Sequence, residues 1–292
     1  MSKAPIPTYD ICSLSMGRPA SDDILVARFS DYLAAHQDIH FPHRHSFYHL
    51  AFFTAGSGSH TIDFERFPVK AGQLYFMIPG QVHSWFFTGD IEGYVMNVSA
   101  GFFNAFLQDD AYVERFPFFS GVSREGVVQL PEEKMTPVVR LFEAMLAEMP
   151  GAEIYSLDML RLLVLEMFIQ VSRAGSQDEK KEVAPHNYVL LRNFRKLVEQ
   201  HYMQLRLPKE YAALLYVTPN YLNAFCRHML GKSAGEIIRD RVLLEAKRLL
   251  INADISIAAV AYQLNFADNS YFTKFFKKYE GITPEEFRKN IS

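Results

Sequence analysis

The sequence has few cysteines, no long apolar run and little net charge, and each shortage narrows the class of protein. Only Cys12 and Cys226 are present, which excludes a disulfide framework, and no metal-ligand spacing surrounds either residue. No stretch approaches the ~20 apolar residues of a membrane-spanning helix. The beginning of the chain lacks the basic and apolar regions of a signal peptide. We therefore expect a soluble, cytoplasmic protein without a membrane partner.

The net charge of −3 conceals an uneven distribution along the 292 residues. Residues 186–292 contain 16 basic and 10 acidic side chains, a net charge of +6. Residues 1–185 contain 14 basic and 23 acidic side chains, a net charge of −9. A basic third on an acidic body predicts a polyanionic partner for that third only.

Residues 24–119 are rich in aromatic and β-branched side chains. Their apolar runs predict strands at Phe47–Thr54, His60–Phe64, Leu74–Ile78 and Tyr94–Val98, and predicted turns lie at 56–58, 70–72, 79–80 and 88–90. The glycine pair at 56 and 58 lacks the following Lys-Ser/Thr of a phosphate loop, so we expect a hairpin turn there. Many short strands at close spacing predict a small antiparallel β-barrel or sandwich within residues 1–130.

After Pro131 the apolar period becomes that of helices. The predicted stripes are Met135, Val139, Phe142, Leu146 and Met149 on one helix, and Leu157, Leu160, Val164, Met167 and Val171 on the next. They predict a helical hairpin over residues 131–173. Residues 174–185 have no periodicity and predict a flexible linker.

The second helix of this hairpin is apolar almost all round. Its other sides carry Met159, Leu162, Leu163, Leu165 and Ile169. A helix of this kind must be covered on two faces. Either a second subunit covers one of them, which would make a homodimer, or both faces are buried within one subunit.

The last ninety residues repeat themselves at an offset of fifty residues. Tyr221-Leu222 returns as Tyr271-Phe272, Phe225 as Phe275, Gly231 as Gly281, and Glu236 as Glu286. Each copy predicts a short amphipathic helix, a tight turn, a second helix with a basic outer face, and a glycine stop. A duplicated helix-turn-helix offers two reading helices to one side of a DNA duplex.

Capping residues predict where these helices begin. Thr218 and Asp268 are expected to cap the two reading helices, and Ser256 the short helix between them. Ser233 with Glu236 forms a capping box that opens a helix running to about Leu250, and Thr283 with Glu286 repeats the box. A rod of that length, roughly 27 Å, could hold the two readers about one DNA turn, ~34 Å, apart.

The outward positions of the two reading helices carry side chains suited to DNA. They are Asn220, Asn223, Ala224 and Arg227 in the first copy, and Asn269, Ser270, Thr273, Lys274, Lys277 and Lys278 in the second. Asparagine amides can pair with adenine, an alanine methyl can touch thymine, and basic side chains can meet phosphates. The alternative is that the basic outer faces of these helices are simply exposed to solvent and bind no DNA. The duplication with its caps and glycine stops favours DNA reading.

The second copy carries a known pattern. Ile257–Leu264, Phe266, Ser270–Phe272, Phe275–Lys278, Gly281 and Thr283-Pro284 together resemble the signature of AraC-type transcriptional regulators, over about residues 187–290. The resemblance implies that both readers enter consecutive major grooves through Asn220, Asn223, Ala224, Asn269, Ser270, Thr273 and Lys274. Two positions depart from the family pattern. Asn265 replaces a glycine but tolerates the left-handed conformation, and Ala224 stands where a long polar or basic side chain is common.

A histidine group lies in the strand-rich part. His43-Arg44-His45, His49 and Gly56 resemble the first cupin motif, with His49 in place of glutamate, and Gly72, Pro79-Gly80 and His83 resemble the second. In cupin enzymes these positions hold a first-row metal, and residues alternating along a strand point the same way. The amino-terminal domains of AraC-type regulators are also cupin-like and often keep histidines without a metal. We therefore expect no cofactor, with His43, His45, His49, His83 and Trp85 lining a ligand site. Metal binding by the four histidines is the alternative.

These features predict a two-domain α and β protein with a cupin-like antiparallel β-barrel, a helical hairpin, and an all-α double helix-turn-helix. The function they favour is a ligand-responsive, homodimeric transcription regulator rather than an enzyme. Its expected partners are promoter DNA, a small-molecule effector and, if it is an activator as the resemblance suggests, RNA polymerase. The rivals are a metal-dependent cupin enzyme with an appended DNA-binding module, and nonspecific nucleic-acid binding.

Overall fold

The computed structural model describes residues 6–16, 21–104, 107, 112–151, 153–175, 185–252 and 254–291. The chain divides into a sheet unit, Pro7–Lys181, and a helical unit, Glu182–Ser292 with Met1–Ile6. The predicted two-domain fold, sheet-rich first and helical second, is confirmed. Over the described residues, no helix is both long and apolar enough to cross a membrane.

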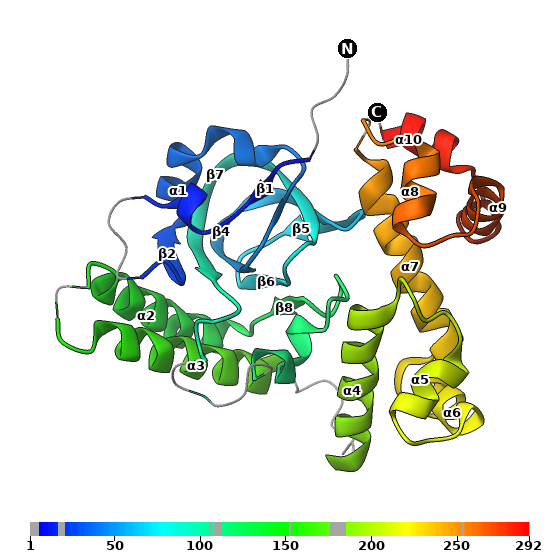
Figure 1. Cartoon of the computed structure of the whole chain (residues 1–292). Coiled ribbons are helices and arrows are strands. Elements are labelled where there is room, and N and C mark those ends of the chain that lie inside the picture. The colour runs from blue at the N-terminus through cyan, green and yellow to red at the C-terminus, as the bar shows by residue number, and fades with distance from the viewer. Residues whose placement is uncertain are drawn as a thin grey trace. The chain divides into compact units, whose positions relative to one another are not determined.

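One mixed sheet forms the body of the sheet unit (Figure 1). Its strands are β1 (Thr8–Tyr9), β2 (Ile24–Arg28), β3 (His43–His45), β4 (Tyr48–Ile62), β5 (Glu65–Val69), β6 (Gln73–Met77), β7 (Val82–Val98) and β8 (Val127–Gln129). The hydrogen-bonded order is β1-β3-β7-β4-β6-β8, with β2 on β7 and β5 on β4. All pairs are antiparallel except β1 with β3. Among the described strands this order does not return to its start, so the sheet of the predicted β-barrel is not closed.

Two predicted turns lie inside long strands. Residues 56–58 belong to β4 and residues 88–90 to β7, and the two segments pair across register shifts beside Ala55. Gly58 has φ +151°, and a Cβ there would lie 2.3 Å from the Phe86 carbonyl oxygen. The glycine therefore permits close approach of two strands at a β-bulge rather than a hairpin turn. The chain reverses instead at Asp63 and Phe64, which have φ values of 47° and 73°.

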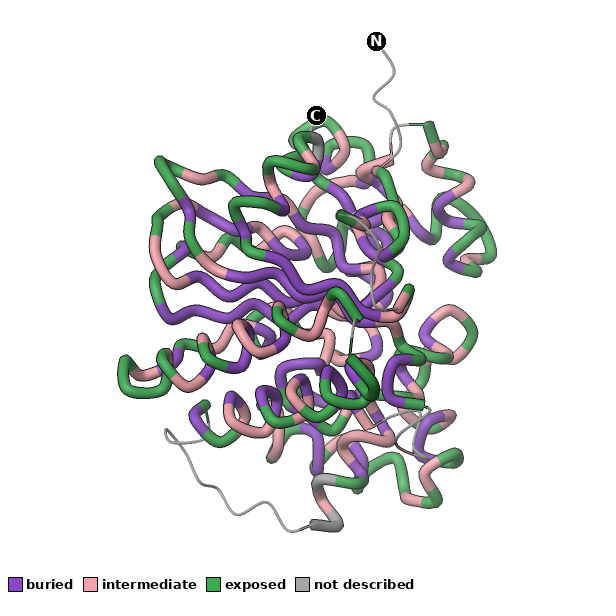
Figure 2. The backbone as a smooth tube through the Cα atoms, turned by 90° about the vertical axis from the view of Figure 1, so that its left-hand side faces the viewer, coloured by how far each residue is buried: buried purple, intermediate pink, exposed green. Residues whose placement is uncertain are grey.

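The central strands are buried along much of their length (Figure 2). Side chains alternate along a strand, and each face of the sheet contributes to a separate buried cluster. One face, with Leu50 and Phe52 of β4, packs against α2 (Glu132–Glu148) and α3 (Ser156–Gly175). The other face, with Ala51 and Phe53, packs against Phe29 of α1 (Phe29–Ala35). Short 3₁₀ helices at Cys12–Leu14, Gln37–His40, Val113–Arg115 and Pro117–Phe119 complete the described part of this unit.

Most apolar side chains of helix α3 contact the core, and Leu163, Leu165 and Ile169 of its other sides are partly buried against it. Leu160, Val164 and Met167 are buried, whereas Met159 and Leu162 are 45% and 48% exposed. The helix continues to Gly175, and α4 begins at Pro185. Both ends of the predicted linker are therefore helical, and its residues 176–184 lie outside the described part.

The helical unit is built around α7 (Ala234–Leu250). The other helices are α4 (Pro185–His201), α5 (Pro208–Leu214), α6 (Pro219–Leu230), α8 (Ile257–Gln263), α9 (Asn269–Glu280) and α10 (Pro284–Ile291). Figure 1 shows α5 and α6 at one end of α7, and α8, α9 and α10 at the other. Helix α7 thus forms the rod between the pair α5–α6 and the group of α8, α9 and α10.

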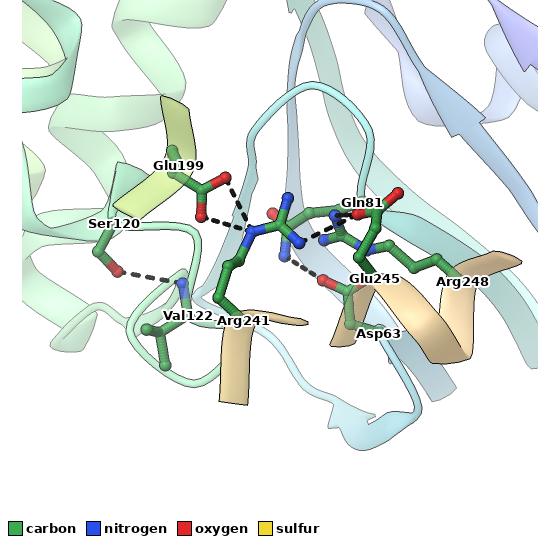
Figure 3. Close-up of polar contacts among 8 residues, drawn as sticks. All are labelled: Asp63, Gln81, Ser120, Val122, Glu199, Arg241, Glu245 and Arg248. Atoms are coloured by element: carbon green, nitrogen blue, oxygen red, sulfur yellow. Dashed lines mark hydrogen bonds and ion pairs between the residues drawn. The ribbon is translucent and has the colours of Figure 1, made fainter. Parts of the chain in front are cut away.

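An ion-pair network joins α4 to α7 (Figure 3). The Arg241 Nε lies 2.7 Å and 2.9 Å from the two carboxylate oxygens of Glu199. Its Nη1 lies 3.0 Å from Glu245 Oε2, and its guanidinium stacks 3.9 Å from the Tyr202 ring centroid. The Arg241 and Glu245 side chains are only 13% and 16% exposed. Water therefore solvates them little, and each charge is stabilised mainly by its ion-pair partners.

Candidate functional site

The two helix-turn-helix units have the same turn geometry. Tyr216 after α5 and Asn265 after α8 both have φ +56°. The next N–H in each copy, of Val217 and Phe266, donates to a carbonyl five residues back at 3.0 Å. This pattern is a Schellman motif, which ends a helix with a left-handed residue. Asn265 therefore adopts the conformation expected of it, and Tyr216 adopts the same one.

The reading helices α6 and α9 begin at the predicted caps. Thr218 Oγ1 accepts the Tyr221 N–H at 3.2 Å, and Asp268 Oδ1 accepts the Tyr271 N–H at 2.7 Å. One residue separates Tyr216 from its cap, whereas two separate Asn265 from Asp268. The second turn is thus one residue longer than the first.

Both reading helices also end alike. Gly231 and Gly281 have φ values of 72° and 82°, a conformation that favours glycine. The next helix begins with a capping box in each copy: the N–H groups of Ser233 and Thr283 donate to Glu236 and Glu286, both at 2.7 Å. Hydrogen bonds from the Ser233 side chain and the Thr283 backbone hold the pKa of the two carboxyls below their usual value.

The outer faces of α6 and α9 carry the predicted DNA-contacting residues. The buried side chains Leu222, Phe225 and Phe272 point into the unit. The predicted positions that are exposed are Asn220, Ala224, Arg227, Asn269, Ser270, Lys274, Lys277 and Lys278, and those partly exposed are Asn223 and Thr273. Asn223 Nδ2 donates to the Pro219 carbonyl at 3.0 Å. This hydrogen bond would have to break before the amide could donate to a base.

Two tyrosines share the first turns of these helices. Tyr221 and Tyr271 are exposed, although aromatic rings are usually buried. They were not among the predicted contact residues. Their recurrence at an offset of fifty residues was the sequence feature that could have singled them out.

The four predicted histidines meet on the face of the sheet that packs against Phe29, here called the inner face. Register brings two of them together, because His43 on β3 lies opposite His83 on β7, while His49 on β4 lies opposite Asn97. The His43 and His83 ring centroids are 4.2 Å apart, and those of His45 and His49 are 4.8 Å apart. The Trp85 ring lies 4.9 Å from that of His83.

A fifth histidine, His60, completes the cluster. Its Nε2 lies 3.0 Å from His83 Nδ1. His60 and His49 are eleven residues apart on β4, a spacing that would place them on opposite faces of an uninterrupted strand. The bulges near Ala55 shift the alternation, so sequence spacing alone could not find this residue.

All five histidines are buried, and burial lowers the pKa of each. The pKa falls to about 4 for His43 and to about 3 for His49. It lies well below the ordinary value for His45, His60 and His83. The rings are therefore neutral at pH 7, and each has one N–H and one lone pair.

Several ring nitrogens of this cluster have no hydrogen-bond partner. They are His43 Nε2, His45 Nδ1, His49 Nε2 and His60 Nδ1, and the buried Trp85 Nε1 is also without one. Buried polar atoms are normally hydrogen-bonded. The inner face of the sheet is therefore suited to a polar ligand or an ion.

Comparison with known proteins matches both units. Residues 30–163 match the AraC-like ligand binding domain, and residues 211–290 match a helix-turn-helix domain. The Msm operon regulatory protein of Streptococcus mutans is 26% identical over 251 residues, 84% of each chain. The HTH-type transcriptional activator RhaR of Mannheimia succiniciproducens is 19% identical over 253 residues, 85% of this chain and 87% of that one.

Other similarities are more limited. This chain spans 33% and 29% of the length of two further curated relatives. The crystal structure of ToxT of Vibrio cholerae with bound unsaturated fatty acid is 15% identical and has a TM-score of 0.43, covering 94% of this chain and 97% of that one. The two family matches, in this order along one chain, show that it belongs to the AraC-type transcriptional regulators, with an AraC-like ligand-binding domain followed by a helix-turn-helix domain.

Proposed function

We propose that this protein is a sequence-specific, ligand-responsive transcription regulator whose α6 and α9 each read one major groove. The observation that carries the proposal is the duplicated, capped reading helix. Each copy presents polar side chains outward beside basic ones, while the apolar side of the same helix is buried. Asparagine, serine and threonine side chains supply base contacts, and Arg227, Lys277 and Lys278 supply phosphate contacts.

The sheet unit is proposed to bind the effector. The buried cluster of His43, His45, His49 and His83 beside Trp85 supplies polar atoms in an apolar surround, which is the composition of small-molecule sites. An effector changes DNA binding only if it has different affinities for two arrangements of the protein. The relative RhaR is described as an activator, which supports activation here and hence contact with RNA polymerase.

A homodimer is proposed through the outer side of α3. Met159 and Leu162 are exposed there on a helix that is otherwise buried or partly buried along its apolar positions. Apolar side chains grouped on a helix surface favour association. Sedimentation of the wild type and of a Met159→Lys, Leu162→Lys variant tests this: the variant is expected to sediment as a monomer, and equal sedimentation of the two would contradict it.

The function is tested by footprinting the protein across its own genome, followed by gel-shift titration of the recovered sites. Recovered sites are expected to share a motif and to resist scrambled competitor DNA at two salt concentrations. Equal affinity for scrambled DNA would contradict sequence-specific reading and would support nonspecific binding. Genes beside the recovered sites would indicate the chemical class of the effector.

A further inference from the structure

Tyr216 combines two properties that a folded chain normally avoids. Its φ of +56° lies in the left-handed region, where a bulky side chain is an outlier. The side chain is also 96% exposed, although tyrosine side chains are usually at least partly buried. The equivalent residue of the second unit, Asn265, has the same φ but is of a type that tolerates it. The first unit therefore accepts backbone strain for a side chain that adds almost nothing to its packing.

The exposed tyrosines of the two reading helices are different, because their rings have partners. Tyr221 stacks on Phe225 of the same helix, with ring centroids 6.2 Å apart. The Tyr271 ring centroid lies 5.8 Å from that of Phe266. At 96% exposure, Tyr216 lacks comparable support among the described residues. Packing therefore does not explain why a tyrosine occupies this turn.

The position of Tyr216 in the fold points to the DNA backbone. It lies between α5 and α6, two residues before Thr218, whose side chain caps α6. Two residues span at most about 7 Å. In a helix-turn-helix the reading helix enters the major groove by its N-terminal residues, and the first helix crosses the backbone. The turn that joins them is therefore carried to the edge of the groove, where phosphate oxygens lie.

The outer face of α6 has fewer cations than that of α9. At the offset of fifty residues, Ala224 and His228 of α6 correspond to Lys274 and Lys278 of α9. Uncharged donors to phosphate would offset part of this difference. Tyrosine is among the side chains that bind phosphate oxygens in protein–DNA complexes. Its hydroxyl carries no charge, so the contact that it makes releases no counterion.

We propose that the Tyr216 hydroxyl donates a hydrogen bond to a phosphate at the edge of the groove that α6 enters, and so positions this helix on the duplex. This assignment rests on the proposed reading of DNA by α6. Strained residues persist where function holds them, and a phosphate contact gives the exposed ring such a function. The contact belongs to the first unit alone, because Asn265 has a shorter side chain and no hydroxyl.

Tyr216→Phe in the full chain tests the contact, because it removes the hydroxyl and keeps both the ring and the backbone conformation. Affinity should fall by about three- to tenfold, the worth of one neutral hydrogen bond, on a recovered promoter site and on random DNA alike. The salt dependence should stay unchanged, because no charge is lost. Unchanged affinity for both DNAs would overturn the proposal, and so would a loss that comes with a lower salt slope.

Tyr155→Phe is the matched control. Tyr155 of the sheet unit is 77% exposed and has φ +68°, so the substitution removes a hydroxyl from an equally unusual tyrosine outside the helix-turn-helix units. Both DNA affinities should stay at the wild-type value. An equal loss in Tyr155→Phe and Tyr216→Phe would show an effect that does not depend on the turn, and it would overturn the assignment.

A second measurement locates the contact on the DNA. Single phosphates of a recovered site are replaced one at a time by uncharged methylphosphonates, and the affinities of the wild type and of Tyr216→Phe are measured for each. At the contacted phosphate the replacement should weaken the wild type more than the variant, because the two changes remove the same hydrogen bond. Equal effects on both proteins at every phosphate would overturn the assignment.

The same titrations separate this contact from the proposed function. If the wild type binds promoter and scrambled DNA equally, sequence-specific reading fails, whereas a loss in Tyr216→Phe on both DNAs still supports the phosphate contact. If the wild type prefers its promoter and Tyr216→Phe binds as tightly, only the contact fails. A wild type that binds no DNA would overturn both.

Discussion

Tyr216 and Asn265 occupy equivalent left-handed positions, both with φ +56°, in the turns of the two helix-turn-helix units. The backbone hydrogen bonds around them match, with Val217 and Phe266 each donating at 3.0 Å. Asparagine adopts this conformation more readily than tyrosine because its short polar side chain can hydrogen-bond locally. The same turn is therefore more strained in the first unit.

Tyr216→Gly is expected to stabilise the protein by about 0.5–1 kcal/mol, and Asn265→Gly by less. Tyr216 is 96% exposed, so removing its ring sacrifices little packing. Tyr262→Gly is the control, since this residue is 84% exposed but lies within α8. It should destabilise by roughly 0.5–1 kcal/mol. Urea denaturation of the three variants measures the differences, and destabilisation by Tyr216→Gly would contradict the strain argument.

Asn223→Ala and Thr273→Ala are expected to weaken binding to a recovered promoter site more than to random DNA. Each lost base contact should cost ~1–3 kcal/mol. Quantitative gel shifts measure both affinities. If both DNAs lost affinity equally, these positions would not read bases.

Arg227→Ala should weaken binding to promoter and random DNA about equally and should lower the salt dependence, because a phosphate contact releases counterions. Lys70→Ala, an exposed charge change in the sheet unit, is the matched control and should leave both affinities unchanged. An unaltered salt slope for Arg227→Ala would argue against a phosphate contact.

The two capping boxes predict a dependence of stability on pH. The pKa values of Glu236 and Glu286 are lowered from 4.5 in the folded protein, so the folded state binds fewer protons than the unfolded one near that pH. Their contribution is therefore present above pH 4.5 and is lost as the pH falls through the folded pKa values. Glutamine also fits a capping box. A Glu236→Gln, Glu286→Gln variant lacks the ionised carboxylates, so it should be less stable than the wild type at pH 7 and show a flatter decline below pH 5 in urea titrations. Parallel declines would refute the assignment.

Arg241→Ala should destabilise the helical unit by about 2–3 kcal/mol, because it leaves the largely buried Glu245 carboxylate without its closest cation. Lys232→Ala removes the exposed ion pair with Asp240, whose side chains are 60% and 44% exposed. It should cost less than about 1 kcal/mol. Thermal unfolding followed by circular dichroism compares the two, and similar losses would contradict a structural role for the Arg241 network.

The helical unit was predictable because its signals are local. Thr218, Ser233, Ser256, Asp268 and Thr283 begin helices where the sequence places them. A cap acts within one helical turn, so no knowledge of distant contacts is needed.

The sheet unit was less predictable because its geometry depends on pairing. The glycines at 56 and 58 suggested a turn, yet β7 holds them inside a strand. The same bulged pairing brings His60 to the face of His49, which strand alternation would forbid. The four predicted histidines do converge. Which of their ring nitrogens lack a partner depends on contacts from Phe41 to His43 and from Asn97 to His49, and these contacts follow from the fold rather than from local sequence.

The reading faces of α6 and α9 are chemically unequal, since Asn220, Asn223 and Ala224 correspond to Ser270, Thr273 and Lys274. The connecting turns also differ by one residue. A subunit that engages both grooves therefore has a head and a tail along the duplex. Its target has polarity: an inverted copy of a site binds the subunit in the opposite direction, so the orientation of the site decides which way the subunit faces along the duplex.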